Sequence, residues 1–253
     1  VPGGVSAEAF PARFSEDELL GFLENDQISN GKKEYVLERA GELLAGNPVQ
    51  QKRVARYADA YYHKWSLNGP YTAIMSEFWK IKAKNSVVKQ IKDMDRDLPV
   101  YDLEHMDWNS IYQLAQEQGE TACTNNDFGI YDEYWDKYVK EQYEQGEIRE
   151  KRQIFTESVE YDDLQCFLEV AEELDIQVLL VSIPVHEEWY FYQGMLCDEY
   201  YEKIRDISEQ YENVELIDMT EYGSEKYCLK DGMHLGWGGW ARINEELYKR
   251  FTD

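Results

Sequence analysis

The sequence lacks several patterns that mark membrane, metal-binding or disulfide-rich proteins. It holds no apolar run of about 18 residues, and its opening VPGGVSAEAF has neither the charged nor the apolar region of a signal peptide. The four cysteines stand far apart without a C-x-x-C pair, so we predict no metal site, no disulfide framework and no cofactor. They are Cys123, Cys166, Cys197 and Cys228.

Positive charge is also scarce. The chain has 26 basic and 51 acidic residues, which gives a formal net charge of -25. The acidic residues are scattered through helical segments rather than gathered in a tail, as on a solvated acidic surface. Such a surface repels nucleic acid phosphates, anionic lipid head groups and polyanionic chains unless a local basic patch offsets it. The composition therefore argues against a nucleic-acid partner.

Residues 1–155 are expected to be mainly helical. Ser15 followed by Glu18 fits a capping box at the start of one helix, and Asp107 is placed to cap another. The tripeptide 68–70, Asn-Gly-Pro, is expected to break the pattern between two helices, and residues 124–129 form a turn. Helices are predicted over 14–24, about 32–45, 49–67, 71–94, 108–118 and 131–153.

The pattern changes over residues 156–253. A helix over 162–175 leads into the apolar run 177–184, and a helix over 197–211 leads into 214–219. Two successive helix-then-strand units predict an α/β fold with a parallel sheet. Two strands are few for a sheet that helices cover on both faces, so we expect further strands before Val1. We treat 1–253 as a single domain with a helical part and an α/β part.

The strongest candidate for chemistry is DGMHLGWGGW, residues 231–240, which follows the last predicted strand and leads into a helix predicted over 241–251. Asp231 and His234 can approach each other on a turn, so that the carboxylate orients the imidazole as a general base. Leu235, Trp237 and Trp240 are expected to anchor the loop in the core. The spacing alone is more typical of a structural histidine whose ring is satisfied by a nearby carboxylate, and it is the glycine and tryptophan context that makes a catalytic role a candidate.

A nucleophile for this pair is missing from the sequence, which contains neither G-D-S nor G-x-S-x-G. Ser182 and Ser224 lack the glycine flanks of a nucleophile elbow, and we interpret both as structural. His186 follows a predicted strand and could line a substrate pocket, because open α/β sheets bind ligands beyond the carboxyl ends of their strands.

The D-x-x-H block followed by Leu-Gly and Gly-Trp resembles the C-terminal part of the DltD family of D-alanyl transfer proteins. The segments VSAEAFPARFSEDEL, TNNDFGIYDEYWDKY and DDLQ through IPVHEEWYFYQG resemble that family in the same order. The resemblance covers nearly the whole chain. It implies an SGNH-hydrolase-like three-layer α/β sandwich with a large helical insertion and its first strands before Val1.

The resemblance also implies a function and a cellular location. Members of the family are membrane-anchored, extracytoplasmic proteins of Gram-positive bacteria that act in the D-alanylation of lipoteichoic and teichoic acids. By this resemblance His234 is the general base and Asp231 its orienter, while the catalytic serine and the membrane anchor precede Val1. The implied partners are a D-alanyl donor, either a carrier protein or an acylated intermediate, and teichoic acid.

Two other functions remain open from the sequence. Without a nucleophile, the chain could be a non-catalytic module that binds a carrier protein or cell-wall polymer. An SGNH esterase acting on another cell-surface polymer would use the same base pair, because Asp231 and His234 encode neither acyl group nor acceptor.

Overall fold

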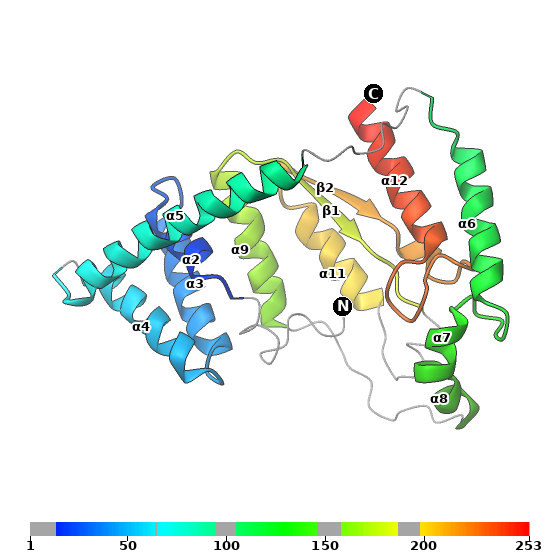
Figure 1. Ribbon diagram of the computed structural model, residues 1–253, viewed down its shortest axis with the longest axis horizontal. Coiled ribbons are helices and arrows are strands. Elements are labelled where there is room, and N and C mark those ends of the chain that lie inside the picture. The colour runs from blue at the N-terminus through cyan, green and yellow to red at the C-terminus, as the bar shows by residue number, and fades with distance from the viewer. Residues whose placement is uncertain (1–13, 64, 95–104, 146–157, 187–197, 253) are drawn as a thin grey trace. The chain divides into compact units, whose positions relative to one another are not determined.

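The structure is a computed structural model that describes residues 14–63, 65–94, 105–145, 158–186 and 198–252. The chain forms two compact units. The first comprises Val1–Tyr101 with Glu169–Asp175, and the second comprises Asp102–Leu168 with Ile176–Asp253. Figure 1 shows the course of the chain through both.

The first unit is helical in the residues that the structure describes. Its helices are α2 (Glu16–Glu24), α3 (Asn30–Leu43), α4 (Pro48–Tyr62), α5 (Asn68–Met94) and the end of α9 (Val159–Glu173). Ser15 caps α2 by accepting a hydrogen bond from the backbone N–H of Glu18 at 3.4 Å. The helix α5 begins at Asn68 rather than at 71, since proline is tolerated in the first turn, where the amide N–H has no partner within the helix.

The core of the first unit contains one buried acidic group. Tyr57 is fully buried, and its hydroxyl donates to Glu16 at 2.5 Å. Arg53 forms an ion pair with the same carboxylate. This pairing satisfies a carboxylate that would otherwise be costly to bury. Tyr57 belongs to a buried apolar cluster with residues of α2, α3, the end of α3 and α4: Leu19, Leu20, Leu37, Ala40, Leu44 and Val54.

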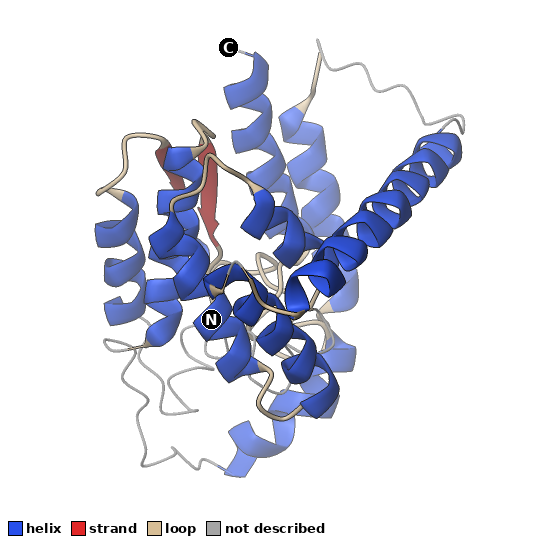
Figure 2. Cartoon of the chain, turned by 90° about the vertical axis from the view of Figure 1, so that its left-hand side faces the viewer, coloured by secondary structure: helices blue, strands red, loops and turns tan. Residues whose placement is uncertain are grey.

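The second unit holds the sheet. Its strands are β1 (Val178–Ser182) and β2 (Val214–Asp218), drawn in red in Figure 2. Its helices are α6 (Trp108–Ala122), α7 (Asp132–Tyr134), the π-helical turn η1 (Trp135–Val139), α8 (Lys140–Gln145), the first part of α9, α11 (Asp198–Ser208), the 3-10 turn η2 (Thr220–Tyr222) and α12 (Trp237–Thr252).

The two strands are parallel, which confirms the predicted α/β fold. Val178 pairs with Val214 and Ser182 with Asp218 at the two ends of the register. Because side chains alternate along a strand, each face presents its own apolar set. Val178 and Leu180 pack with residues of α9 and α11, whereas Val181 packs with residues of α12 and of the loop before it. The described strands are thus covered by helices on both faces.

Several element boundaries differ from the prediction. The amphipathic segment starting at residue 131 forms α7, η1 and α8 in place of one regular helix, and its expected continuation over 146–153 lies outside the described residues. The last helix begins at Trp237, so the glycine pair 238–239 lies inside it. None of the described helices is long and apolar enough to cross a bilayer.

Candidate active site

The D-x-x-H turn is tied together at its base by backbone hydrogen bonds. Lys230 N–H donates to the His234 carbonyl at 2.9 Å, and Gly236 N–H donates to the Cys228 carbonyl at 2.7 Å. Leu229 and Leu235 form an antiparallel bridge between these bonds, and both side chains are buried. These hydrogen bonds and the buried leucines restrict the conformation of residues 231–234, which lie between them.

Asp231 organises that tip. Its Oδ1 accepts hydrogen bonds from the backbone N–H groups of Met233 at 2.9 Å and His234 at 2.7 Å. Its Oδ2 lies 2.8 Å from His234 Nδ1. The Asp231 side chain is 16% exposed, and the His234 side chain is 63% exposed. The carboxylate is therefore fixed by two amides while the ring that it orients faces outward.

This arrangement has the geometry of a general base and its orienter. An ionised Asp231 accepts the Nδ1 proton, so the free lone pair of the neutral imidazole is on Nε2. The two serines considered from the sequence lie at a strand end and in a turn. The Ser182 carbonyl accepts from Met219 N–H at 3.0 Å at the end of β1, and Ser224 is exposed in the turn after η2.

His186 lies beneath the turn. Its backbone N–H donates to the Gly232 carbonyl at 2.9 Å. Its ring is edge-on to Phe128, with Nε2 3.3 Å from the Phe128 carbonyl. The residue is 6% exposed. In this structure, the His186 backbone supports the D-x-x-H turn through its hydrogen bond to Gly232.

Residues 124–132 form a second support for the turn. Tyr131 N–H donates to the Lys230 carbonyl at 2.9 Å, and the Tyr131 hydroxyl accepts from Trp237 N–H at 3.2 Å. One residue of this segment thus touches the chain on both sides of Asp231 and His234. The sequence marks the segment as a turn but gives no signal that it meets the D-x-x-H loop more than a hundred residues later.

The segment 124–132 is itself shaped by Asn126 and Gly129. Asn126 Oδ1 accepts from the backbone N–H groups of Phe128 at 3.1 Å and Ile130 at 3.2 Å. Gly129 has a φ of +72°, and a Cβ there would lie 2.9 Å from the Tyr227 backbone nitrogen. Both the left-handed backbone and this close approach require glycine. The segment can therefore sit directly against the chain that leads into the D-x-x-H loop.

The first turn of α12 holds the other end of the loop. Gly238 N–H donates to the Tyr227 carbonyl at 3.2 Å, and Trp240 N–H donates to the Gly236 carbonyl at 3.0 Å. Leu235 is buried, as expected, but Trp237 is 51% and Trp240 52% exposed. The expectation that both tryptophans anchor the loop in the core is wrong. The backbone contacts of Gly236 and Gly238 bring the helix close to the loop, and the tryptophan rings remain half exposed.

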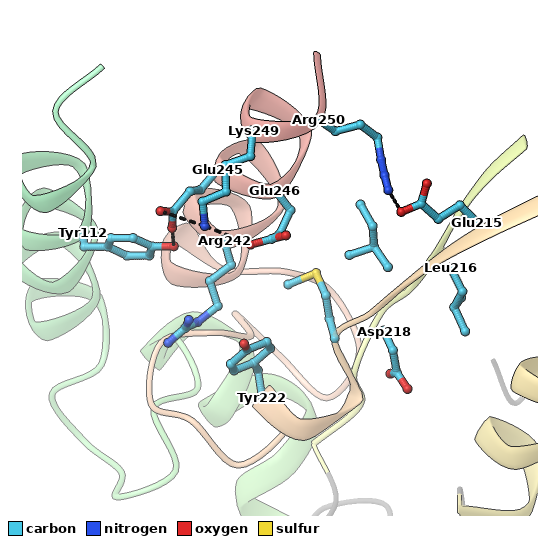
Figure 3. Close-up of a pocket in the computed structure, with 12 residues that line it drawn as sticks. Tyr112, Glu215, Leu216, Asp218, Tyr222, Arg242, Glu245, Glu246, Lys249 and Arg250 are labelled. Atoms are coloured by element: carbon cyan, nitrogen blue, oxygen red, sulfur yellow. Dashed lines mark hydrogen bonds and ion pairs between the residues drawn. The ribbon is translucent and has the colours of Figure 1, made fainter. Parts of the chain in front are cut away.

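A separate cavity lies between α6, β2 and α12 (Figure 3). It has a volume of about 660 Å³, and charged side chains line much of it. Tyr112 hydroxyl donates to Glu245 at 2.5 Å, Lys249 lies 3.2 Å from the same carboxylate, and Arg250 pairs with Glu215. Burial and the neighbouring Glu245 raise the pKa of Tyr112 above its usual range. These charges are paired with one another and link α12 to α6 and β2.

Two of the cysteines are expected to be poorly reactive. Burial raises the pKa of the Cys228 thiol to about 11, and burial together with Asp132 raises that of Cys123 to about 12. Because the thiolate is the nucleophile, both should react with iodoacetamide at pH ~8 at least ~100-fold more slowly than an unfolded cysteine. Peptide mapping of the native and urea-unfolded chain measures this. Equal rates in the two states would contradict the predicted protection.

The chain matches the DltD protein family over residues 1–252. It is 27% identical to protein DltD of Staphylococcus aureus (strain NCTC 8325 / PS 47) over 97% of this chain and 62% of that protein. It is 23% identical to protein DltD of Bacillus subtilis (strain 168) over 97% of this chain and 64% of that protein. The chain therefore spans somewhat less than two thirds of the length of these relatives. The match along almost all of its residues shows that the chain belongs to the DltD family.

Proposed function

We propose that the protein acts in the D-alanylation of teichoic acids and supplies the His-Asp half of a Ser-His-Asp acyl-transfer site. The observation that carries this proposal is the 2.8 Å contact between Asp231 Oδ2 and His234 Nδ1, with the His234 ring facing outward. A histidine that serves only packing has no need of a carboxylate fixed by two backbone amides. Membership of the DltD family adds the D-alanyl chemistry.

In the proposed reaction a serine upstream of Val1 attacks the carbonyl of a D-alanyl ester or thioester. His234 Nε2 takes the serine proton and returns it to the leaving oxygen or sulfur, which yields an O-D-alanyl serine. A teichoic acid hydroxyl then gives its proton to His234 and attacks this ester. The transfer regenerates the serine when His234 returns that proton to the serine oxygen. Asp231 stabilises the imidazolium that forms in each half.

The same proposal places the described strands in an SGNH-like three-layer sandwich. The helices on both faces of β1 and β2 fit such a layering, and strands upstream of Val1 would extend the sheet. An N-terminal segment before Val1 would anchor the protein at the extracytoplasmic face of the cell membrane. In this view 1–253 is one domain of the longer protein, and His186 supports the loop that carries the base.

A binding module is the second candidate. It is favoured by the places of Ser182 and Ser224, which the structure assigns to a strand end and a turn. In that case the 253-residue chain would hold a carrier protein or cell-wall polymer without transferring an acyl group. Restoring the upstream sequence separates the acyl-transfer protein from the binding module. An acyl-transfer protein must have a nucleophilic serine that a fluorophosphonate probe labels, whereas a binding module needs no such serine.

Genetic replacement tests the proposed function in the cell. The longer protein that includes residues 1–253 should restore D-alanine esters to the teichoic acid of a Gram-positive bacterium that lacks its own DltD protein. The His234→Gln variant should not, because glutamine cannot accept the serine proton. Ester-linked D-alanine released by mild base is the measurement. Restoration by His234→Gln at equal protein level would remove the catalytic assignment while leaving a role in D-alanylation.

A further inference from the structure

The helix α5 carries an apolar stripe on the side that faces away from the core of its unit. Ile74 is 69%, Phe78 54% and Ile81 63% exposed. Their spacing places them on one face, because residues four and seven positions apart lie above one another on an α-helix. The opposite face packs on the helical core through Met75 and Trp79. Both faces of α5 are thus apolar, and only one of them is covered in the described part of the chain.

Two further apolar residues just before α5 in the chain are exposed. Trp65 is 97% and Leu67 95% exposed. Single exposed apolar residues are normal on proteins, but a tryptophan and a leucine that bury almost none of their surface on folding are unusual. We call these five residues the α5 surface: Trp65, Leu67, Ile74, Phe78 and Ile81.

Lysines flank the stripe, although the chain as a whole is strongly acidic. Exposed Lys82 and Lys84 fall on its two sides, since successive helical residues turn by about 100°. Five lysines lie within residues 80–92, and Glu77 is the one acidic residue of the sequence between 71 and 92. Lys82 Nζ lies 4.1 Å from the centre of the Trp79 ring, which holds it near the helix surface. Lys80 is paired with Glu24 and Glu77, whereas Lys82 and Lys84 are exposed beside the stripe. The exposed side of this helix is therefore locally basic.

We infer that the α5 surface docks on an anionic lipid bilayer, with α5 lying in the plane of the membrane. An anionic bilayer binds apolar side chains that are flanked by lysines. The apolar side chains enter the boundary between head groups and acyl chains, and the lipid phosphates attract the lysines. An exposed tryptophan also favours the level of the head groups. An anionic polymer alone would leave Ile74, Phe78 and Ile81 in water. This contact is additional to any anchor before Val1 and does not depend on the Asp231–His234 chemistry.

Vesicle flotation of the 253-residue chain tests the inference. The chain should float with vesicles of phosphatidylcholine mixed with phosphatidylglycerol and much less with phosphatidylcholine alone. The Ile74→Ser, Phe78→Ser, Ile81→Ser triple variant should lose at least about 10-fold in partitioning, since it removes most of the apolar contact. Phe251→Ser, which changes a residue 78% exposed on α12, is the matched control and should bind as the parent chain does.

Two charge-reversal variants test the electrostatic contribution to vesicle binding separately from the apolar contribution. Lys82→Glu with Lys84→Glu should weaken binding to anionic vesicles by at least about 10-fold, since each basic residue near such a surface contributes roughly fivefold. Lys137→Glu with Lys140→Glu makes the same change in net charge on the other unit and should have little effect. Circular dichroism confirms that each variant is folded.

Two results would overturn the inference. The first is failure of the parent chain to float with anionic vesicles. The second is flotation of the triple serine variant at the parent level. If the parent chain does not float, polyglycerol phosphate binding that needs Lys82 and Lys84 would assign the α5 surface to a polymer, and self-association that needs Phe78 would assign it to a second copy of the chain.

Discussion

Replacing His234 with alanine is expected to lower the proposed acyl transfer by about 10⁴- to 10⁶-fold. In the proposed mechanism the imidazole removes the serine proton, and its loss leaves an alcohol that attacks poorly at neutral pH. The ring is 63% exposed, so its removal should leave the fold intact. Release of a chromogenic thiol from a D-alanyl thioester measures the turnover, and thermal unfolding measures stability.

Asp231→Asn sharpens the same test without changing the shape of the turn. The asparagine carbonyl can still accept from Met233 and His234 N–H, whereas its amide nitrogen cannot accept the His234 Nδ1 proton. The ring then favours the wrong tautomer, and turnover should again fall by about 10⁴-fold. Asp206→Asn, an exposed change on α11, should leave turnover unchanged. Parent-level turnover in His234→Ala would show that another group is the base.

The sheet could be predicted because its signals are local. The segments that became β1 and β2 are short apolar runs, each preceded by a helical pattern, and such a connection joins parallel strands. The observed pairing of Val178 with Val214 agrees with this. The D-x-x-H turn could also be predicted from the sequence, since the glycines and the Asp231–His234 spacing lie within ten residues of chain.

The remaining parts of the site depend on contacts between distant residues. Nothing near Tyr131 in the sequence indicates that its backbone N–H meets Lys230 and its hydroxyl meets Trp237. Likewise, burial of the His186 ring follows from its packing on Phe128, which comes from a loop 58 residues earlier. Local patterns indicate the candidate catalytic pair, but the segments that support it become visible only in three dimensions.

The start of α12 shows how a helix boundary can also depend on tertiary contact. The glycines at 238 and 239 are poor helix formers, so the sequence places the start of the helix after them. In the structure Gly239 is helical and buried, and a Cβ at that position would lie 2.4 Å from the Cys228 carbonyl oxygen. The close approach of the helix to this backbone outweighs the low propensity of glycine.

This contact predicts a large effect for Gly239→Ala. The added methyl group would meet the Cys228 carbonyl oxygen at 2.4 Å and Leu235 Cδ2 at 2.6 Å, so α12 or the loop must move. Overpacking of this kind is expected to lower the free energy of unfolding by about 3 kcal/mol. Leu235 belongs to the bridge that frames His234, so acyl transfer should fall as well. Denaturant unfolding followed by tryptophan fluorescence measures the stability change.

Gly41→Ala is the matched control, because nothing lies within 4 Å of a Cβ at that position in α3. There alanine should raise the free energy of unfolding by about 0.5–1 kcal/mol through its better helix propensity. The same substitution should thus act in opposite directions at two helical glycines. If Gly239→Ala unfolds at the parent denaturant concentration, α12 does not rest on the Cys228 backbone, and the His234 turn must be held mainly by Tyr131 and His186.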